Sequence, residues 1–239
     1  MRTAVVTGAG RGLGKAIALR LAAEDHRVIA VDIDEGTAKA TAEAAGGSSY
    51  GCDVADRTAV LELASEIGPV EVLINNAGIW RMGPVLEQSG RDIDDVVGVN
   101  LLGTLYCCQA FAPGMAQLGD GRIVNFSSAA AAMRAGGTGI YTAAKGAIEI
   151  LTQQFAGELG PSGIRVNAVA PGFIVTEGSA ASYAGERESQ RMRAVPLRRV
   201  GAPDDIANVV SFLVSDQSSY VSGQVVAVDG GLTAARPTP

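Results

Sequence analysis

The sequence predicts a single α/β domain built on a doubly wound parallel sheet of about seven strands, with helices on both faces. Two observations lead to this fold class. Short apolar runs rich in β-branched residues alternate with stretches of helical period along the chain, and a glycine-rich turn joins the first apolar run to the first helical stretch. With 239 residues, 47% of them hydrophobic, the chain can bury one sizeable core without a second domain.

Each apolar run is expected to form one strand, because parallel strands covered by helices on both faces are apolar along their whole length. These runs are residues 3–8, 27–32, 48–53, 70–75, 121–127, 164–170 and 224–229. Helical period marks residues 15–24, 34–45 and 139–155. The domain is expected to span residues 1–239, with a flexible tail at 232–239.

The glycine-rich turn follows the first strand directly. Strand, turn and helix in this order bring free backbone N–H groups and the positive end of a helix dipole to one point, which predicts an anion site. The spacing of Gly8, Gly12 and Gly14 departs from the G-x-G-x-x-G fingerprint, since Leu13 or Lys15 stands where the last glycine would be. A purely steric use of glycine in a tight turn is the alternative.

Asp32 ends the second apolar run, twenty positions after Gly12. A carboxylate there can hydrogen-bond the hydroxyls of an adenosine ribose, or it can cap the following helix. A 2′-phosphate carries about −1.5 to −2 charges, and like unit charges about 4 Å apart repel by about 4 kcal/mol at an effective dielectric near 20. We therefore expect NAD as cofactor rather than NADP, although Arg11 could swing towards a phosphate.

Tyr141 and Lys145 stand four residues apart in a helical stretch, so their side chains share one face. A phenol titrates near pH ~10, and a fixed cation beside it favours the phenolate. We expect Lys145 to lower the pKa of Tyr141 enough for proton exchange with a substrate. The single histidine, His26, is expected in a surface turn, and the chain shows no metal-ligand spacing.

At this point the chain resembles the short-chain dehydrogenase/reductase family, along nearly its whole length. TGAGRGLG is similar to the family's cofactor turn, CDV to the segment that borders the adenine, and NNAG to a signature after the fourth strand, in which Asn75 is expected to be structural. VNLLG, NFSS, YTAAK and RVNAVAPGFIVT follow in the family's order. The resemblance implies a Rossmann-type fold and hydride transfer between a secondary alcohol and a ketone.

The resemblance also assigns roles to residues. The implied catalytic residues are Asn100, Ser128, Tyr141 and Lys145, with Ser128 preferred over Ser127 because it lies thirteen positions before the tyrosine. Tyr141 would be the acid or base, Ser128 would polarise the substrate oxygen, and Asn100 would position a water. The implied cofactor-binding residues are Gly8, Arg11, Gly12, Leu13, Gly14, Asp32, Asp53, Val54, Asn76, Ala77, Gly78, Tyr141, Lys145, Pro171, Gly172, Ile174 and Thr176.

The substrate pocket is expected, by resemblance, in the segment 173–200. Its arginines could meet an acidic group or simply form a solvated helix face: Arg187, Arg191 and Arg193. Three apolar side chains could line the pocket or pack elsewhere: Trp80, Met82 and Met133. We expect a secondary alcohol or ketone. A 3-oxoacyl-thioester (acyl-carrier-protein) reductase is the alternative, disfavoured by Asp32 because such reductases usually take NADPH, and a non-enzymatic dinucleotide sensor is less favoured.

Composition limits the partners. A formal charge of −6 and a pI near 4.9 argue against a nucleic-acid surface. We expect no signal peptide and no membrane helix, because no apolar run approaches the roughly 20 residues of a membrane span. An odd number of cysteines, Cys52, Cys107 and Cys108, fits reduced thiols and a cytoplasmic location. By resemblance we expect a homotetramer that pairs through the helices carrying Asn100 and Tyr141 and through the last strand.

Overall fold

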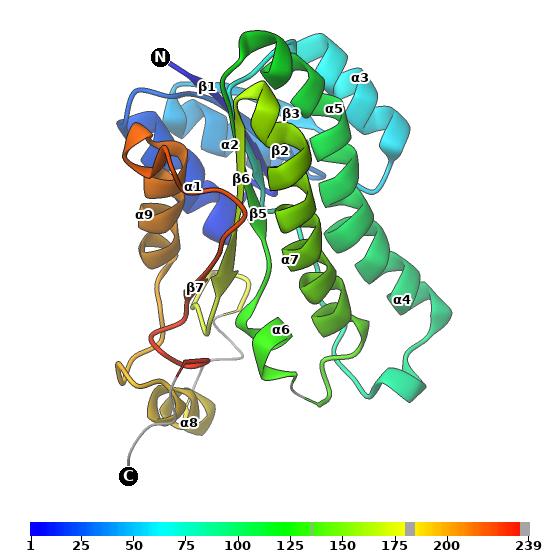
Figure 1. The fold of residues 1–239 in the computed structure, drawn as a ribbon. Coiled ribbons are helices and arrows are strands. Elements are labelled where there is room, and N and C mark those ends of the chain that lie inside the picture. Colours follow the sequence, from blue (N-terminus) through cyan, green and yellow to red (C-terminus); the bar gives the residue numbers. More distant parts are fainter. Residues whose placement is uncertain (135, 180–184, 235–239) are drawn as a thin grey trace.

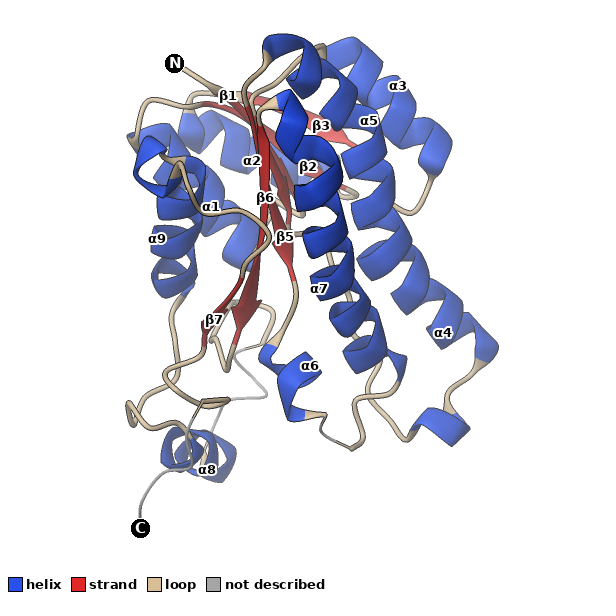
Figure 2. Ribbon diagram, viewed as in Figure 1, coloured by secondary structure: helices blue, strands red, loops and turns tan. Residues whose placement is uncertain are grey.

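The computed structural model describes residues 1–134, 136–179 and 185–234, without the side chains of 186 and 187. Seven parallel strands form one sheet in the order β3-β2-β1-β4-β5-β6-β7, with helices packed on both faces (Figures 1 and 2). The predicted fold class is confirmed. The strands are β1 Thr3–Thr7, β2 Arg27–Asp32, β3 Ser48–Gly51, β4 Val72–Asn75, β5 Gly121–Phe126, β6 Ile164–Pro171 and β7 Val225–Val228.

The helices alternate with the strands, as the sequence pattern predicts. In the described part of the chain they are α1 Gly12–Ala23, α2 Glu35–Ala45, α3 Arg57–Ile67, α4 Gly90–Val97, α5 Gly103–Leu118, α6 Ala129–Met133, α7 Ile140–Leu159, α8 Glu186–Ala194 and α9 Pro203–Val214. A π-helical segment, Gly98–Leu102, joins α4 to α5.

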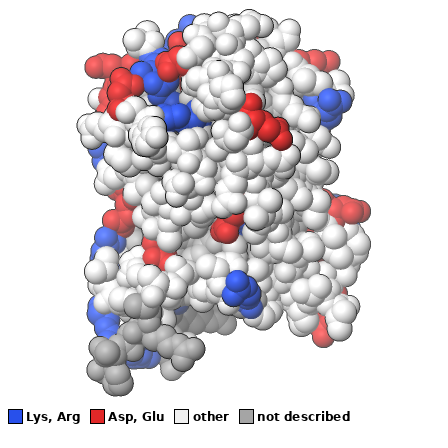
Figure 3. All heavy atoms as spheres, in the orientation of Figure 1, with Lys and Arg blue, Asp and Glu red and all other residues white. Residues whose placement is uncertain are grey.

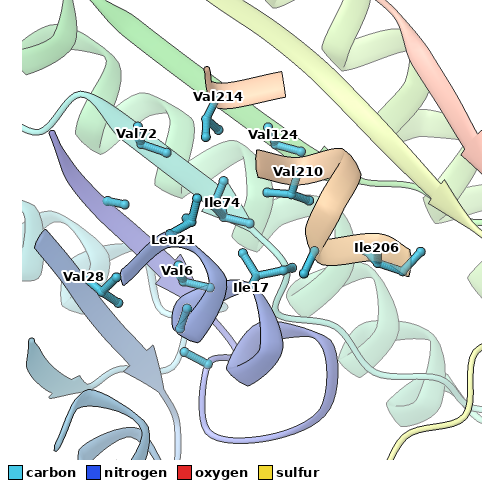
Figure 4. Close-up of a cluster of buried hydrophobic side chains, with 14 of the residues drawn as sticks. Val6, Ile17, Leu21, Val28, Val72, Ile74, Val124, Ile206, Val210 and Val214 are labelled. Carbon is cyan, nitrogen blue, oxygen red and sulfur yellow. The ribbon is translucent and has the colours of Figure 1, made fainter. Parts of the chain in front are cut away.

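Two hydrophobic clusters fill the space between the sheet and its helices. Alternate residues of β1 point to opposite faces, so Val6 packs with Ile17 of α1 and Val210 of α9 (Figure 4). Val5 packs on the other face, where Phe111 of α5 belongs to the same cluster. Figure 1 shows α1, α2 and α9 on one side of the sheet and α3, α5 and α7 on the other.

The strand order reverses between β1 and β4. β1 pairs with β2 on one side and with β4 on the other, with Val6 opposite Ile74. In open α/β sheets, ligands bind outside the carboxyl ends of the strands at this point. The topology therefore directs attention to the residues that follow Thr7 and Asn75.

One helical stretch in the described residues, Gly90–Leu118, is long and apolar enough by length and composition to cross a membrane, with a mean hydropathy of 1.3 in its most apolar window. This corrects the expectation that no apolar run approaches that length. Because 44% of the window is buried, and Cys107, Phe111 and Met115 lie in the core, the stretch has the character of an inner helix of a globular domain. It is weak support for a membrane partner.

The last described residues form a turn after β7. Thr233 donates from its N–H and its hydroxyl to Asp229, at 2.8 and 2.6 Å, so residues 232–234 of the expected flexible tail form a hydrogen-bonded turn. Residues 235–239 lie outside the described part. On the face drawn in Figure 3, basic and acidic side chains lie side by side at the upper left, and most of the remaining surface in this view is uncharged.

Candidate active site

The ends of β1 and β4 are tied together at the point where the strand order reverses. The Asn76 side-chain nitrogen donates to the carbonyl oxygens of Thr7 and Gly8, at 2.9 and 3.0 Å. The Ala77 N–H donates to the Thr7 hydroxyl at 3.1 Å. These bonds fix the glycine turn against the segment Asn76–Gly78, so the two predicted cofactor segments lie side by side.

The glycines of the turn allow a close approach of α1 to the sheet. Gly8 and Gly12 have φ angles of +63° and +56°, in the left-handed region that favours glycine. A Cβ on Gly8 would lie 2.9 Å from the Ala77 Cα, and a Cβ on Gly14 would overlap the Gly8 carbonyl oxygen. The turn therefore needs glycine at these positions for steric reasons, in addition to any ligand.

The first turn of α1 is left open for an anion. Its N-cap residue, Arg11, makes no side-chain capping bond, and the turn contains no acidic residue. By contrast, α2, α3 and α4 begin at Asp34, Asp56 and Ser89, whose side chains accept backbone N–H groups. Because the first N–H groups of a helix have no partner inside it, and the dipole is positive there, the turn fits the pyrophosphate of a dinucleotide.

Asp32 ends β2 beside this turn. Its two carboxylate oxygens accept from the Gly10 N–H at 2.9 Å and from the Asp34 N–H at 3.1 Å. Asp34, not Asp32, caps α2, by accepting from the Thr37 N–H. The interpretation of Asp32 as a helix cap is therefore wrong, and its carboxylate is fixed at the carboxyl edge of the sheet, where a ribose would lie.

The residues predicted beside the adenine follow β2 and β3. The Asp53 carboxylate accepts from the Ala55 N–H at 2.9 Å. Val54 is buried against Gly103, and a Cβ built on Gly103 would lie 2.8 Å from the Val54 side chain. Sequence reasoning missed Ile33, an apolar side chain that is 73% exposed directly after Asp32. The sequence feature that could have identified it is an isoleucine just beyond the end of a buried strand, where an apolar side chain could cover a flat apolar ring.

Asn75 is structural, as predicted. It is buried, and its side-chain nitrogen donates to Asn125 Oδ1 at 2.9 Å, while the Asn125 amide donates to the Thr152 hydroxyl at 3.0 Å. This ladder joins β4, β5 and α7 through the core. It holds in register the three elements that carry the following site residues.

Asn100 lies in the π-helical segment and is fully buried. Its side-chain nitrogen donates to the carbonyl oxygens of Ile79 and Val96, at 2.8 and 2.9 Å, whereas its Oδ1 atom has no hydrogen-bond partner among the described residues. A Cβ on Gly78 would lie 2.8 Å from this oxygen and 3.5 Å from Lys145 Nζ. Both polar atoms therefore lie close to Gly78, and a side chain at this position would crowd them.

Lys145 and Tyr141 lie on one face of α7. The Lys145 Nζ atom is 5.8 Å from the centre of the Tyr141 ring and donates to the Phe126 carbonyl oxygen at 2.8 Å. Lys145 is only 4% exposed, and its burial lowers its pKa from 10.5 to about 8. The structure therefore brings together three of the predicted catalytic side chains, Asn100, Tyr141 and Lys145.

Ser128 caps α6 directly after β5, accepting from the Ala130 N–H at 3.2 Å. It is half-buried, and α6 packs against α7, which carries Tyr141. Ser127 is buried, with its hydroxyl 3.1 Å from the Lys145 carbonyl oxygen and 2.7 Å from Glu149 Oε1. These contacts occupy Ser127 in packing and are consistent with the preference for Ser128.

A cleft of about 410 Å³ lies between α1, the segment after β6 and the start of α9; it touches the glycine turn at Gly12, and none of the predicted catalytic residues lines it. A Cβ on Gly12 would lie 3.5 Å from the Thr176 side chain, and both line the cleft. Gly172 follows Pro171 at the end of β6, and a Cβ on it would lie 2.6 Å from the Asp229 backbone. The Ile174 side chain is packed in the core, so a contact of this residue with a cofactor would have to be made by its backbone.

The expected substrate segment is partly described. Its two ends are held together, because the Gly201 N–H donates to the Phe173 carbonyl oxygen and the Val175 N–H donates to that of Gly201, at 2.8 and 3.0 Å. The Arg191 guanidinium lies 5.3 Å from the centre of the Phe173 ring. Residues 180–184 and the Arg187 side chain lie outside the described part. The expected apolar side chains Trp80, Met82 and Met133 are exposed by 52%, 59% and 42%.

The three cysteines lie in the hydrophobic core. Cys52, Cys107 and Cys108 are free and buried, and burial raises the pKa of the Cys108 thiol to about 12. They behave as core side chains. The single histidine, His26, is half-buried in the turn before β2, with its ring nitrogen 3.2 Å from the Leu21 carbonyl oxygen.

A doubly wound sheet, an open glycine turn and a Tyr-Lys pair at the carboxyl edge define a dinucleotide-binding oxidoreductase. A family model described as enoyl-(acyl carrier protein) reductase matches residues 8–233. The chain is 44% identical to the short-chain reductase protein NovJ of Streptomyces niveus, over 95% of this chain and 92% of that one. It is 40% identical to the 3-oxoacyl-[acyl-carrier-protein] reductase FabG of Staphylococcus aureus, over 97% and 98%.

A solved structure is also similar to this chain. A putative NAD(P) dependent gluconate 5-dehydrogenase from Beutenbergia cavernae, with bound NADP at low occupancy, superposes with a TM-score of 0.93 at 38% identity, covering 98% of this chain and 97% of that one. The chain belongs to the short-chain dehydrogenase/reductase family of oxidoreductases, whose members bind NAD(P).

Proposed function

We propose that this protein interconverts a secondary alcohol and a ketone with NAD as cofactor. The observation that carries the proposal is the buried cluster in which Lys145 Nζ lies beside the Tyr141 ring and, across Gly78, near Asn100 Oδ1. The cluster is at the carboxyl edge of the sheet, beside a glycine turn that fits a dinucleotide. A proton path next to a dinucleotide site is what alcohol oxidation requires.

In the proposed mechanism, a nicotinamide held beside the glycine turn would supply the hydride acceptor for oxidation and the hydride donor for reduction. Tyr141, as phenolate, takes the hydroxyl proton as the carbon–oxygen double bond forms, and in reduction it gives that proton back. The Lys145 ammonium favours the phenolate by its charge. Ser128 donates a hydrogen bond to the substrate oxygen and so stabilises the charge that develops on it.

Asn100 completes the proton path in this proposal. Its Oδ1 atom, which has no partner within the described part of the chain, is buried beside Gly78 and Lys145. A buried acceptor without a partner costs free energy unless water or a ligand satisfies it. A water bound there would carry a proton between Lys145 and solvent. The asparagine is held for this purpose by its two backbone acceptors.

The preference for NAD rests on the fixed carboxylate of Asp32. Both of its oxygens are held by backbone N–H groups, so it is not free to turn away from a 2′-phosphate, and that group would be repelled. The exposed Ile33 side chain next to it would cover the adenine. A similar protein binds NADP, so the preference of this chain for NAD over NADP has to be measured directly.

A second candidate function is reduction of a 3-oxoacyl thioester. It is favoured by the 40% identity to FabG and by the description of the matching family model. Arg191, stacked over Phe173 in the substrate segment, would face the anionic end of such a substrate. Asp32 argues against it, because the resemblance associates these reductases with NADPH.

The deciding experiment follows the absorbance band of reduced nicotinamide over a panel of secondary alcohols, ketones and 3-oxoacyl thioesters, with NAD(H) and NADP(H). The proposal expects turnover of an alcohol or ketone with NAD(H). Turnover restricted to 3-oxoacyl thioesters with NADPH supports the second candidate. Tight NAD binding without turnover of any compound supports a dinucleotide sensor instead.

We also infer that the protein forms a homotetramer. Apolar side chains are exposed on two helices that the described chain leaves uncovered, Ile150 on α7 and Phe212 on α9, and such surfaces commonly mark interfaces. The mass in solution tests this inference. A species of about four times the 24.3 kDa chain mass is expected, and a monomer would contradict it.

A further inference from the structure

Gln88 hydrogen-bonds the first turn of the helix that carries Tyr141. That helix, α7, starts at Ile140, and the preceding residue, Gly139, has no side chain to cap it. The Gln88 Oε1 atom accepts from the Ile140 N–H at 2.6 Å. First-turn N–H groups need a partner from outside the helix, so a residue 52 positions earlier performs the capping that a local Ser or Asp usually performs.

The Gln88 amide is held in place by Gly139 and by the Arg81 carbonyl oxygen as well as by Ile140. Gly139 has a φ of +59°, and a Cβ on it would overlap the Gln88 amide group, so the amide lies flat against this glycine. The Gln88 Nε2 atom donates to the Arg81 carbonyl oxygen at 2.8 Å. Both polar atoms of the side chain are therefore used, and its orientation is fixed.

The segment 79–88 links two predicted catalytic residues. At its start, the Ile79 carbonyl oxygen accepts from the Asn100 side chain at 2.8 Å. In its middle, the Gly83 N–H donates to the Gly137 carbonyl oxygen at 2.8 Å, next to the start of α7. At its end, Gln88 bonds the N-terminus of α7. One short segment thus spans from Asn100 to the helix turn of Tyr141.

We propose that Gln88 is a positioning residue for Tyr141. By fixing where α7 begins, it sets the place of the Tyr141 hydroxyl relative to the Asn100–Lys145 cluster. The inference rests on the proposed function, since it requires Tyr141 to exchange a proton with the substrate. Displacing a reacting group by about 1 Å can lower a rate by about 10²-fold, so a loosened first turn reduces turnover while the more distant glycine turn still binds NAD.

The test compares matched variants of the full-length protein, with the best alcohol or ketone of the panel and NAD(H). Gln88→Met removes both hydrogen bonds at similar volume, and Gln88→Glu keeps an acceptor for Ile140. Gln154→Met makes the same chemical change at an exposed side chain of α7 whose hydrogen bond in the described structure is to Glu158, at 2.8 Å. Gly139→Ala displaces the Gln88 amide from the opposite side. Hydrogen exchange of the peptide 139–147 is measured without substrate.

We expect Gln88→Met and Gly139→Ala to lower kcat by about tenfold or more, with KM for NAD changed by less than about twofold. Gln88→Glu should recover kcat to within about threefold of the parent, and Gln154→Met should leave it unchanged. The α7 start should exchange faster in Gln88→Met and Gly139→Ala and return towards the parent rate in Gln88→Glu.

Three results would overturn the proposal: parental kcat in Gln88→Met, no recovery in Gln88→Glu, or a kcat loss no larger than the loss of folded protein measured by thermal unfolding. If Gln88→Met does not fold, Gln88→Glu and Gly139→Ala decide by the same criteria. Tyr141→Phe is assayed alongside. If it keeps parental turnover, the proposed function fails; if it is inactive while Gln88→Met is fully active, only the role of Gln88 fails.

Discussion

The Lys145 ammonium nitrogen lies 5.8 Å from the centre of the Tyr141 ring, in an environment that leaves the lysine only 4% exposed. Burial makes the charge costly to the fold, as its lowered pKa shows. A cation kept at such a cost beside a phenol is expected to serve chemistry rather than stability. This relationship leads to the first prediction.

Replacing Lys145 by Met should change how stability depends on pH. The pKa of Lys145 lies near 10.5 in the unfolded chain and at about 8 in the folded one, so the unfolded state binds more protons between these values and the parent gains stability as pH rises through them. Relative to Lys145→Met, the parent should gain up to roughly 3 kcal/mol between pH 7 and 10.5. Urea unfolding at a series of pH values measures this, and parallel curves for the two proteins would contradict it.

Gly14→Ala should destabilise the protein, because the added Cβ overlaps the Gly8 carbonyl oxygen and forces α1 away from the sheet. The expected cost is about 1–3 kcal/mol, with weaker NAD binding, since the glycine turn moves with the helix. Gly157→Ala, in α7 with open space around it, is the control and should stabilise by up to about 1 kcal/mol. Equal effects of the two changes in urea unfolding would refute the close approach at Gly14.

Asp32→Asn should weaken the discrimination between cofactors. Removing the fixed negative charge removes its repulsion of a 2′-phosphate, so the ratio of kcat/KM for NAD to that for NADP should fall by about tenfold or more. Asp34→Asn is the matched control, because asparagine is also a good N-cap for α2. An unchanged ratio in Asp32→Asn would show that another residue sets the preference.

Asp205 should contribute stability that is lost at low pH. Its carboxylate accepts from Arg199 at 2.6 and 2.7 Å and from the Ala202 N–H at 2.8 Å, and these bonds lower its pKa from 3.8 to about 2. The stabilisation is present above pH 3.8 and disappears as pH falls towards 2. Asp205→Asn should cost about 1 kcal/mol near neutral pH, as a capping loss at an exposed site, and the thermal unfolding curves of the two proteins should converge on acidification.

Local patterns were enough to predict the seven strands and the pairing of Tyr141 with Lys145. Both depend on short-range geometry: a buried parallel strand is apolar throughout, and residues four apart on a helix share a face. The structural role of Asn75 was also predicted correctly. Asp34 could have been recognised as the cap of α2 instead of Asp32, because it directly precedes the first helical residue.

Other features depend on contacts between segments that are far apart in sequence, so no local pattern predicts them. The π-helical segment that buries Asn100 is stabilised in part by a bond to Ile79, twenty-one positions earlier. Gln88 meets Ile140 across 52 positions. The packing of the Ile174 side chain in the core likewise depends on a distant residue, Gly201. A Cβ on Gly201 would overlap the Ile174 side chain.

The most direct test of the proposed chemistry is the turnover number of Tyr141→Phe, measured with NAD and the best alcohol of the panel, together with its affinity for NAD. Removing the hydroxyl removes the proton acceptor and leaves the cofactor turn intact, so kcat should fall by at least about 10²–10⁴-fold with little change in NAD affinity. A variant that binds NAD normally and turns over at nearly the parental rate would contradict the assignment of Tyr141 as the acid and base.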